Sequence, residues 1–350
     1  MASPPSQYDR LSDLPKVDLH RHLEGSLRLQ TLMEIAKQEG LDLPQEESLL
    51  REQVQIGSAE PKTLPNFLAK FRLLRPIYRS PEIIQRVIHE AIEDAAIDNI
   101  MYLELRFTPA ALSHAKDFAL DEVVAWVIEF ANDAGREFGI RVGLIASVNR
   151  HESVKLAEAV AQIAADNVGE GILGLDLAGN ELDFPADPFI SIFKSSGEAG
   201  LETTVHAGEW SGADSVKQAL TLMGASRIGH GVRVMEDAEV VAIARDRRAA
   251  FEVCLTSNLH SGVISGMEKH PLSEMINAGL VVTLNTDDPG ISNIRLSDEY
   301  FTAVSELGLS EETLKGLILS GAQYSFLPKS DKKQLEDQLQ ESLGLGMKES

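Results

Sequence analysis

The chain has 350 residues, enough for one large domain or two ordinary ones, and 43% of them are apolar while only 5% are aromatic. It carries 54 acidic against 32 basic side chains, and this net charge of -22 makes nucleic acids and anionic membrane surfaces poor partners. The single cysteine, Cys254, excludes an intrachain disulfide and a thiolate-rich metal site. A small neutral ligand remains compatible with this composition.

The N-terminal ten residues lack the apolar core of a signal peptide. No uncharged apolar run approaches the length of a membrane span. A single cysteine is typical of a reducing compartment. We therefore expect a soluble cytoplasmic protein.

Short apolar runs rich in β-branched residues recur along the chain, separated by longer stretches with helical periodicity. This alternation is typical of repeated strand–helix units that build a parallel sheet. Eight runs occur, which is the number of strands that closes a (β/α)8 TIM barrel, an α/β fold. They span residues 17–23, 101–107, 141–148, 171–179, 202–209, 227–232, 251–257 and 280–288.

The gap between the first two runs is far longer than one helix requires. Its segment TLPNFLAKFRLLRPIY, which starts at Thr63, has apolar residues at helical spacing together with Pro65 and Pro76. We interpret it as a helical lid inserted after the first strand, beside the barrel mouth. The pattern alone equally permits an extra helix packed on the outside.

No linker rich in Pro, Gly or Ser divides the chain. We expect one barrel domain over residues 1–350, with a core at about 14–327 and tails at 1–10 and 329–350. The second tail is typical of a charged terminal helix that frays.

Gly169, Gly171 and Gly174 spell GxGxxG, the fingerprint of dinucleotide-binding folds. That motif requires a preceding strand and a following helix. Here a helical pattern precedes the glycines and a strand-like run passes through them. We therefore expect no dinucleotide cofactor.

His20 and His22 lie two residues apart in the first run. Because side chains alternate across a strand, both imidazoles project on one side and can share a metal ion. An HxH pair alone is weakly specific, and two packed or exposed histidines are the alternative. The position favours a metal, since barrel active sites form where the strands end.

Two further histidines are placed in the same way. His206 is near the end of the fifth run, with Glu209 after it, and His230 is in the sixth. Each alone is more typical of a packed core histidine, but four of them at strand ends indicate one site. The other five are expected at the surface or in loops: His89 and His151 in helical segments, His114 and His260 in loop-like stretches, and His270 before Pro271.

Asp287 and Asp288 end the eighth run. Burying a carboxylate there is costly unless a cation or hydrogen bonds compensate it. Because neighbours on a strand point to opposite sides, one acid can face a metal and the other a substrate. Taken alone, TDDPG is more typical of an acidic turn.

Three imidazoles and a carboxylate suit a borderline metal such as zinc, and the absence of thiolates fits a catalytic site. We predict one Zn²⁺ per chain, with a position left open for water. Zinc can lower the pKa of that water to near neutrality, and a carboxylate such as Glu209 can move its proton. This combination predicts hydrolysis at an electrophilic carbon.

From about Leu14 to about Leu327 the chain resembles the adenosine deaminase family of the amidohydrolase superfamily. The segments that carry the resemblance are LPKVDLHRHLEGSLR, TLPNFLAKF, LDLAGNE, TVHAGE, RIGHG, EVCLTSNL and LNTDDPG. The resemblance implies a TIM barrel that deaminates an adenine nucleoside, with TLPNFLAKF as its helical gate.

The resemblance also implies residue roles, motif by motif. The zinc ligands would be His20, His22, His206 and Asp287. Glu209 would protonate the purine N1 while hydroxide adds to C6 and ammonia leaves, and His230 would orient and stabilise that hydroxide. The backbone at Gly179 would contact N3, and Asp288 would bond N7. Two-metal members of the superfamily use a modified lysine, and GLDLAGNE has none, which agrees with one zinc.

Two positions depart from the family pattern. At Glu24 the nucleoside deaminases usually have an aspartate that binds the ribose 5′-hydroxyl, whereas adenine deaminases have glutamate in HLEG. NTDDPG is closer to the nucleoside deaminases, so adenosine and 2′-deoxyadenosine stand first. Free adenine and a modified nucleoside such as aminodeoxyfutalosine are the alternatives. Asn180 replaces a common aspartate, while Gly179 and Glu181 match.

Two other classes of function remain as rivals. One is a non-enzymatic binding protein that keeps the fold and a structural metal, although such a protein has no need of Glu209. The other is a metal-dependent hydrolase of esters or amides, for which Asp288 would have no purine to bind.

Overall fold

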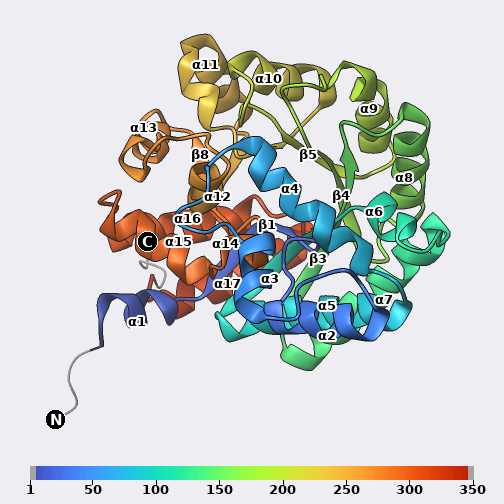
Figure 1. Cartoon of the computed structure of the whole chain (residues 1–350). Coiled ribbons are helices and arrows are strands. Elements are labelled where there is room, and N and C mark those ends of the chain that lie inside the picture. Colours follow the sequence, from blue (N-terminus) through green and yellow to red (C-terminus); the bar gives the residue numbers. More distant parts are fainter. Residues whose placement is uncertain (1–4, 346–350) are drawn as a thin grey trace.

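Eight parallel strands form one sheet in the order β1 to β8 in the computed structural model, which describes residues 5–345. The sheet closes where Arg21 pairs in parallel with Asp287, so the seam of the barrel lies between β1 and the segment after β8. Helices surround the strands (Figure 1), and the predicted TIM barrel is confirmed. The strands are β1 (Lys16–His22), β2 (Ile100–Phe107), β3 (Arg141–Asn149), β4 (Ile172–Ala178), β5 (Glu202–His206), β6 (Arg227–Gly229), β7 (Ala250–Val253) and β8 (Val281–Leu284).

Several predicted runs extend beyond the strands that they contain. The sixth run stops being a strand at Gly229, the seventh at Val253 and the eighth at Leu284. His230 and Asp287 have positive φ angles of 56° and 62°, which strand geometry does not permit. These residues follow the strands in buried loops, and burial gives such loops the same apolar pattern as the strands themselves.

The outer ring is built mainly from amphipathic helices. In α7, for example, Val123, Val127, Ala131 and Ala134 recur at helical spacing and are buried against the barrel. The ring and its short connecting helices are α6 (Pro109–His114), α7 (Leu120–Phe138), α8 (Val154–Asp166), α9 (Ile190–Glu198), α10 (Ala213–Gln218), α11 (Ala238–Arg247), α12 (Leu255–His260), α13 (Leu272–Asn277), α14 (Pro289–Ser292), α15 (Leu296–Ser305) and α16 (Glu311–Gln323). Single turns lie at η2 (Asp187–Phe189), η3 (Ala219–Met223), η4 (Val232–Glu236) and η5 (Met267–Lys269).

The long segment between β1 and β2 is helical, as predicted. It consists of α2 (Leu29–Glu39), α3 (Glu47–Val54), α4 (Leu64–Leu74), η1 (Arg75–Ile77) and α5 (Pro81–Ile97). Thr63 caps α4 by accepting a hydrogen bond from the Asn66 amide, and Pro65 occupies the first turn, where its missing N–H costs nothing. Figure 1 shows α4 crossing in front of the strands, at the barrel mouth.

Both predicted tails contain packed helices. At the N-terminus, α1 (Gln7–Ser12) is anchored by a 3.0 Å hydrogen bond from the Tyr8 hydroxyl to Asp298. At the C-terminus, α17 (Lys329–Ser342) buries Leu335 and Leu339 and packs against α16. The expectation of a fraying terminal helix is therefore wrong for these residues, because the apolar stripe outweighs their charge. Residues 1–4 and 346–350 lie outside the described part of the tails.

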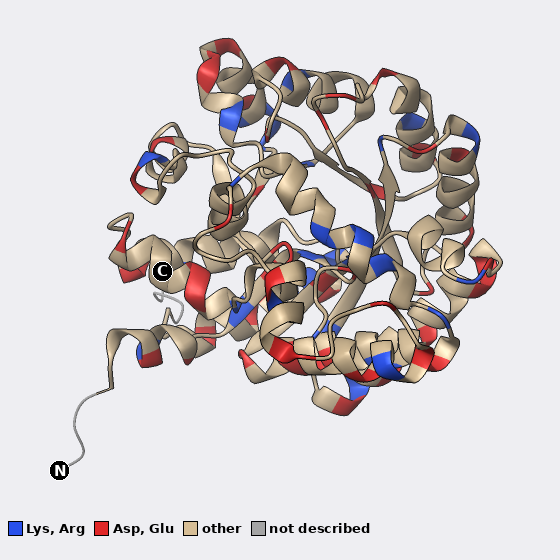
Figure 2. Cartoon of the chain, in the orientation of Figure 1, with Lys and Arg blue, Asp and Glu red and all other residues tan. Residues whose placement is uncertain are grey.

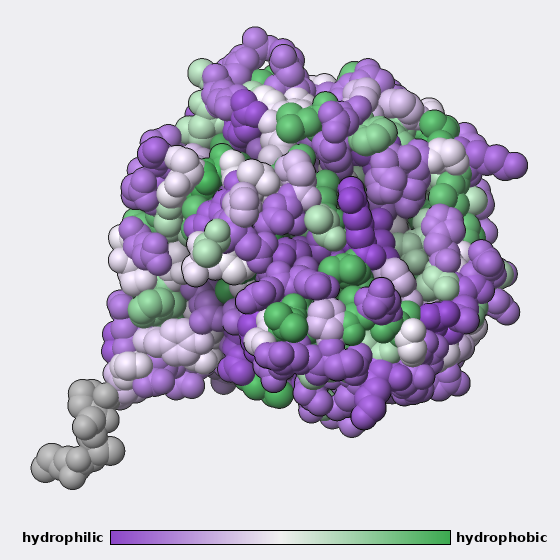
Figure 3. All heavy atoms as spheres, viewed as in Figure 1, coloured by the Kyte–Doolittle hydropathy of each residue, from purple (hydrophilic) through white to green (hydrophobic). Residues whose placement is uncertain are grey.

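The surface of the mouth side is mostly hydrophilic, with apolar residues in scattered patches (Figure 3). Among the described helices, none combines the length and the apolar character that crossing a bilayer requires.

Candidate active site

Four side chains that the sequence singled out meet at the carboxyl ends of the strands. One ligand atom from each lies within 4.8 Å of those of the others, and the four residues are His20, His22, His206 and Asp287. The Asp287 Oδ1 atom is 3.3 Å from the Nε2 atoms of both His20 and His22. The Nε2 atom of His20 is buried and forms no hydrogen bond with any described residue. A buried nitrogen without a partner is costly, so its position favours a cation at this point.

Backbone pairing across the barrel seam places these residues. The Asp287 amide donates to the His20 carbonyl at 2.7 Å, and the His22 amide donates to the Asp287 carbonyl at 2.8 Å. His20 and His22 alternate with Arg21 on β1, so their imidazoles share one side, as predicted. The left-handed backbone of Asp287 turns its carboxylate toward both rings.

The donor set fits a single divalent cation of zinc type. Three imidazoles and one carboxylate are nitrogen and oxygen ligands that zinc accepts. Burial lowers the pKa of His22 well below its usual value, so this imidazole is neutral at pH 7, the form that binds a metal.

A second layer of buried charges orients the imidazoles. The Nδ1 atom of His20 is 2.7 Å from Glu252, and the Nδ1 atom of His206 is 3.0 Å from Asp176. Arg106 lies between the two carboxylates, 2.8 Å from Glu252 and 3.3 Å from Asp176. Because each carboxylate accepts a hydrogen bond from the Nδ1–H group of its histidine, the Nε2 atom of that ring is free to bind a metal.

Glu252 is the centre of this layer. It also accepts hydrogen bonds from Arg227 Nε at 2.6 Å and from the Thr204 hydroxyl at 2.9 Å. Burial alone would raise the pKa of Glu252, but the guanidinium groups of Arg106 and Arg227 hold it well below its usual range. This layer of paired charges was not predicted from the sequence. Charged residues inside the apolar strand runs could have indicated it, because a buried charge requires a partner.

Glu209 lies in the loop after β5, fully buried beside the metal-ligand cluster. Glu181 holds this loop by accepting backbone hydrogen bonds from Gly208, Glu209, Trp210 and Ser211 at 2.8 to 3.1 Å, and from the Ser215 hydroxyl. Burial, together with the nearby carboxylates of Asp287, Glu181 and Asp288, raises the pKa of Glu209 well above its usual range. This environment favours the protonated form of Glu209.

A chain of hydrogen bonds fixes the tautomer of His230. The Leu272 amide donates to His270 Nδ1 at 3.1 Å, so the proton of that ring is on Nε2, which lies 3.2 Å from the Asn258 oxygen. The Asn258 amide group then donates to His230 Nδ1 at 3.1 Å. The His230 proton is left on Nε2, which lies 3.7 Å from Glu209 and 3.8 Å from Asp287.

His270 lies in a loop, as expected, but it is not at the surface. It is only 6% exposed, and it reaches the site through Asn258, which sequence spacing cannot reveal. His151 lies in a turn before α8 and not in a helix. His89 is in α5, as predicted, while His114 and His260 end the short helices α6 and α12.

Replacing Asn258 by Asp tests this chain of hydrogen bonds. The carboxylate would accept a proton from His230 Nδ1 where the amide donates, so the ring would lose its fixed tautomer. We expect kcat to fall about 10- to 100-fold. Bound metal and the melting temperature should change little. Asn132→Asp, at an exposed position of α7, is the matched control, and equal losses in both variants would contradict the role.

Three further predicted residues line one cavity with the cluster: Glu24, Gly179 and Asp288. Asp288 packs so closely on Gly25 that a Cβ atom there would lie 1.7 Å from Oδ1, so only glycine fits. Burial, together with Asp287 and Glu24, raises the pKa of Asp288 well above its usual range, which favours the protonated form of this carboxyl group. Glu24 accepts a 2.9 Å hydrogen bond from the Thr108 amide through one oxygen, and its other oxygen is buried without a described partner.

The helix α4 and the turn η1 form the outer wall of this cavity. Phe67, Leu68, Phe71 and Arg75 line it opposite the cluster. The cavity holds about 70 Å³, well below the 300 Å³ or more of typical ligand pockets. The segment thus covers the site closely.

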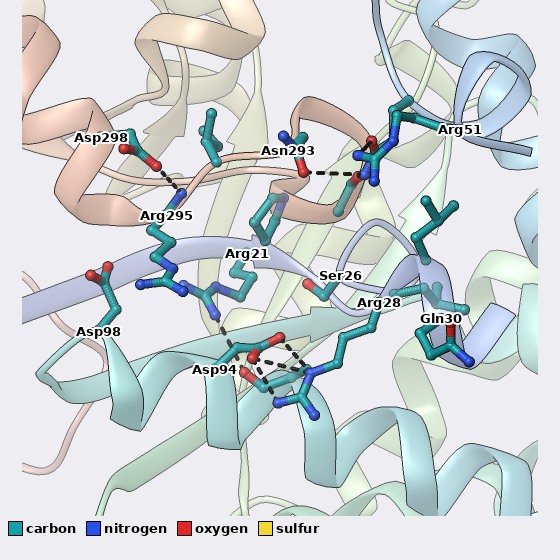
Figure 4. A pocket seen from close by; sticks show the side chains of 17 residues that line it. Arg21, Ser26, Arg28, Gln30, Arg51, Asp94, Asp98, Asn293, Arg295 and Asp298 are labelled. Atoms are coloured by element: carbon teal, nitrogen blue, oxygen red, sulfur yellow. Dashed lines mark hydrogen bonds and ion pairs between the residues drawn. The ribbon is translucent and has the colours of Figure 1, made fainter. Parts of the chain in front are cut away.

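A larger cavity, of about 430 Å³, lies elsewhere (Figure 4). Pro289 and Gly290 line it, and it contains none of the metal-ligand residues. Its charged side chains largely satisfy one another, as where Arg28 binds Asp94 at 2.7 Å. We assign no chemistry to it.

The fold and the site define a class of protein. It is a (β/α)8 barrel that can bind one divalent metal ion at the carboxyl ends of its strands, beside a buried carboxyl group with a raised pKa.

Comparisons with known proteins identify the family. The family model described as Adenosine deaminase matches residues 15–342. An adenosine deaminase of Salmonella typhimurium is 37% identical over 332 residues, 94% of this chain and 98% of that protein. One of Klebsiella pneumoniae is 36% identical, covering 92% of this chain and 96% of that protein. The chain belongs to the adenosine deaminase family.

Solved structures agree with this family. An adenine deaminase from Arthrobacter aurescens is 27% identical, with a TM-score of 0.87 over 95% of this chain and 99% of that one. An N6-methyl-AMP deaminase from Arabidopsis thaliana is also 27% identical, with a TM-score of 0.83 over 96% of this chain and 98% of that one.

Proposed function

We propose that the protein is a zinc-dependent deaminase that hydrolyses adenosine and 2′-deoxyadenosine to inosine and 2′-deoxyinosine, with release of ammonia. The observation that carries the proposal is the burial of Glu209, a carboxyl group with a raised pKa, beside the cluster of three imidazoles and Asp287. Relatives named adenosine deaminases, more than a third identical over nearly the whole chain, support it.

The residues that would hold the metal are His20, His22, His206 and Asp287. Bound there, zinc would supply the acidity that makes water a nucleophile near neutral pH. His230 would orient the attacking water, because its Nε2 proton faces the space between Glu209 and Asp287.

The protein would recognise the purine by donating hydrogen bonds to its ring nitrogens. N1, N3 and N7 are all acceptors, so each requires a donor. Protonated Glu209 would give its proton to N1, and protonated Asp288 would bond N7. The backbone N–H of Gly179 would contact N3. Protonation of N1 makes C6 more electrophilic, which is the point of attack in this reaction.

We infer that α4 is the lid of this site. A cavity of about 70 Å³ does not accommodate a nucleoside, so α4 has to move outward for binding. Slower hydrogen exchange of the α4 amides with inosine bound would report closure.

We also propose that residues 1–350 act as one domain, and that the protein works in the cytoplasm on a small purine, without nucleic acid or membrane.

Glu24 supports a second candidate substrate. Its side chain is longer than the aspartate typical of nucleoside deaminases, and one of its oxygens is buried without a described partner. Free adenine, or an adenine nucleoside with a modified ribose, therefore stands as the alternative.

A substrate panel tests the function. The zinc-loaded protein is mixed with adenosine, deoxyadenosine, adenine and aminodeoxyfutalosine, and loss of the adenine absorbance band is followed. We expect adenosine and deoxyadenosine to be turned over with a higher kcat/KM than free adenine. If all four stay unchanged, the protein is not such a deaminase, and the reading as a metal-stabilised binding protein replaces it.

A further inference from the structure

The segment over the barrel mouth is basic in an otherwise acidic protein. Residues 63–79 contain four basic side chains and no Asp or Glu, while the chain as a whole has a net charge of -22. Figure 2 shows Lys and Arg along α4 and η1 where they cross the mouth. The four are Lys70, Arg72, Arg75 and Arg79.

These basic side chains differ in their partners. Lys70 lies 2.8 Å from Glu60, and Arg79 lies 3.7 Å from Glu39. Arg72 is exposed to water. Arg75 is partly buried, yet its guanidinium group makes no hydrogen bond or ion pair with any described residue, and its Nε atom is fully buried.

Arg75 lines the cavity of the candidate active site. It lines the same cavity as His22, Glu24 and Thr108, and its guanidinium carbon lies 5.7 Å from the centre of the Phe71 ring. A buried Nε–H donor without an acceptor is unfavourable unless binding supplies one. An anionic group on the bound substrate is such an acceptor, and it would form charge-assisted hydrogen bonds with Arg75.

We propose that Arg75 is a specificity residue for adenine nucleosides that carry an anionic group at the 5′ end of the ribose. The inference rests on the proposed function and on the family pattern, in which the residue at the position of Glu24 meets the 5′ end of the ribose. Two kinds of anionic group have this chemistry: a phosphate on the 5′ carbon, and a carboxylate at the end of a longer 5′ substituent. The carboxylate of Glu24 repels an anion placed directly on the 5′ carbon. The longer substituent can pass Glu24 along the apolar wall of Phe67, Leu68 and Phe71 and reach Arg75.

The test measures selectivity. We compare kcat/KM for adenosine, adenosine 5′-monophosphate and aminodeoxyfutalosine, whose long 5′ substituent ends in a carboxylate. In the wild type, at least one of the two acidic substrates should exceed adenosine by about 10- to 100-fold. The ratio of acidic to neutral kcat/KM should fall by at least about 10-fold in Arg75→Gln, and less in Arg75→Lys, which keeps the charge but loses the planar fork. Arg79→Gln, on the same segment but paired with Glu39, is the matched control and should keep the ratio.

A binding measurement separates this inference from the proposed function. Trp210 lines the cavity, so its fluorescence reports binding of inosine and inosine 5′-monophosphate without any turnover. Adenosine turnover with no preference for either acidic substrate, and an unchanged ratio in Arg75→Gln, would overturn the role of Arg75. Absence of turnover with every purine would instead overturn the proposed function. In that case the binding data decide. If inosine 5′-monophosphate binds no more tightly than inosine, both in the wild type and in Arg75→Gln, the role of Arg75 is overturned as well.

Discussion

Glu209→Gln is expected to lower kcat for adenosine by about 10²- to 10⁴-fold, the contribution typical of a general acid, while the metal stays bound. The amide has nearly the same shape as the carboxyl group but cannot release a proton to N1. Glu209 is not among the metal-ligand residues, so metal content should be unchanged. Initial rates from adenine absorbance and elemental analysis of the purified variant measure both quantities.

The pH dependence of the activity is a second test of Glu209→Gln. Burial and the surrounding carboxylates raise the pKa of Glu209, so its proton is present at neutral pH and is lost as the pH rises through that raised value. Activity of the wild type should therefore fall on the alkaline side, and the residual activity of Glu209→Gln should lack this decline. Glu158→Gln, at an exposed position of α8, is the control. Full turnover in Glu209→Gln would show that another group supplies the proton.

Glu252→Gln is expected to give the largest loss of stability. The change removes one carboxylate from Arg106, Arg227 and His20 at once, and it leaves two buried guanidinium groups short of a partner. Breaking a buried ion pair in this way costs about 3–5 kcal/mol of unfolding free energy. Metal affinity should also fall by about 10- to 100-fold, since His20 loses the acceptor that orients it. Urea unfolding and competition with a chelator measure the two effects.

Glu104→Gln is the matched control for this prediction. Glu104 belongs to the same buried layer, 2.5 Å from Arg227, but it has no hydrogen bond with a metal-ligand histidine among the described residues. It should lower stability while metal affinity stays within about 3-fold of the wild type, because second-layer effects act through direct contact with a ligand. Equal losses of metal affinity in both variants would mean that the layer acts on the metal only through general stability.

The sequence predicted those residues of the candidate site that lie at the ends of strands. His20 and His22 share a side because β1 alternates, and His206 ends β5, so their convergence followed from the barrel alone. Asp287 and Asp288 did not follow from the local pattern, since TDDPG taken alone is more typical of an acidic turn. The structure places them after β8, at the seam, where backbone pairing with β1 brings Asp287 to the histidines.

Other residues could not be placed from their local pattern. His270 before Pro271 resembles a loop histidine, and only the packing of its loop near Asn258 connects it to His230. Arg75 belongs to the segment that the sequence predicts to be a lid. Of the four basic residues in that segment, only Arg75 lines the cavity, and this depends on how α4 lies over the barrel mouth.

The sequence by itself determined the barrel, the ligand types and the chemistry, because strand periodicity and residue type are local properties that eight repeated units express in the same way. The tertiary structure alone decided which carboxyl groups have raised pKa values, which tautomer His230 adopts and which arginine lines the cavity. Those properties depend on burial and on distances between residues remote along the chain, and no pattern within one segment contains them.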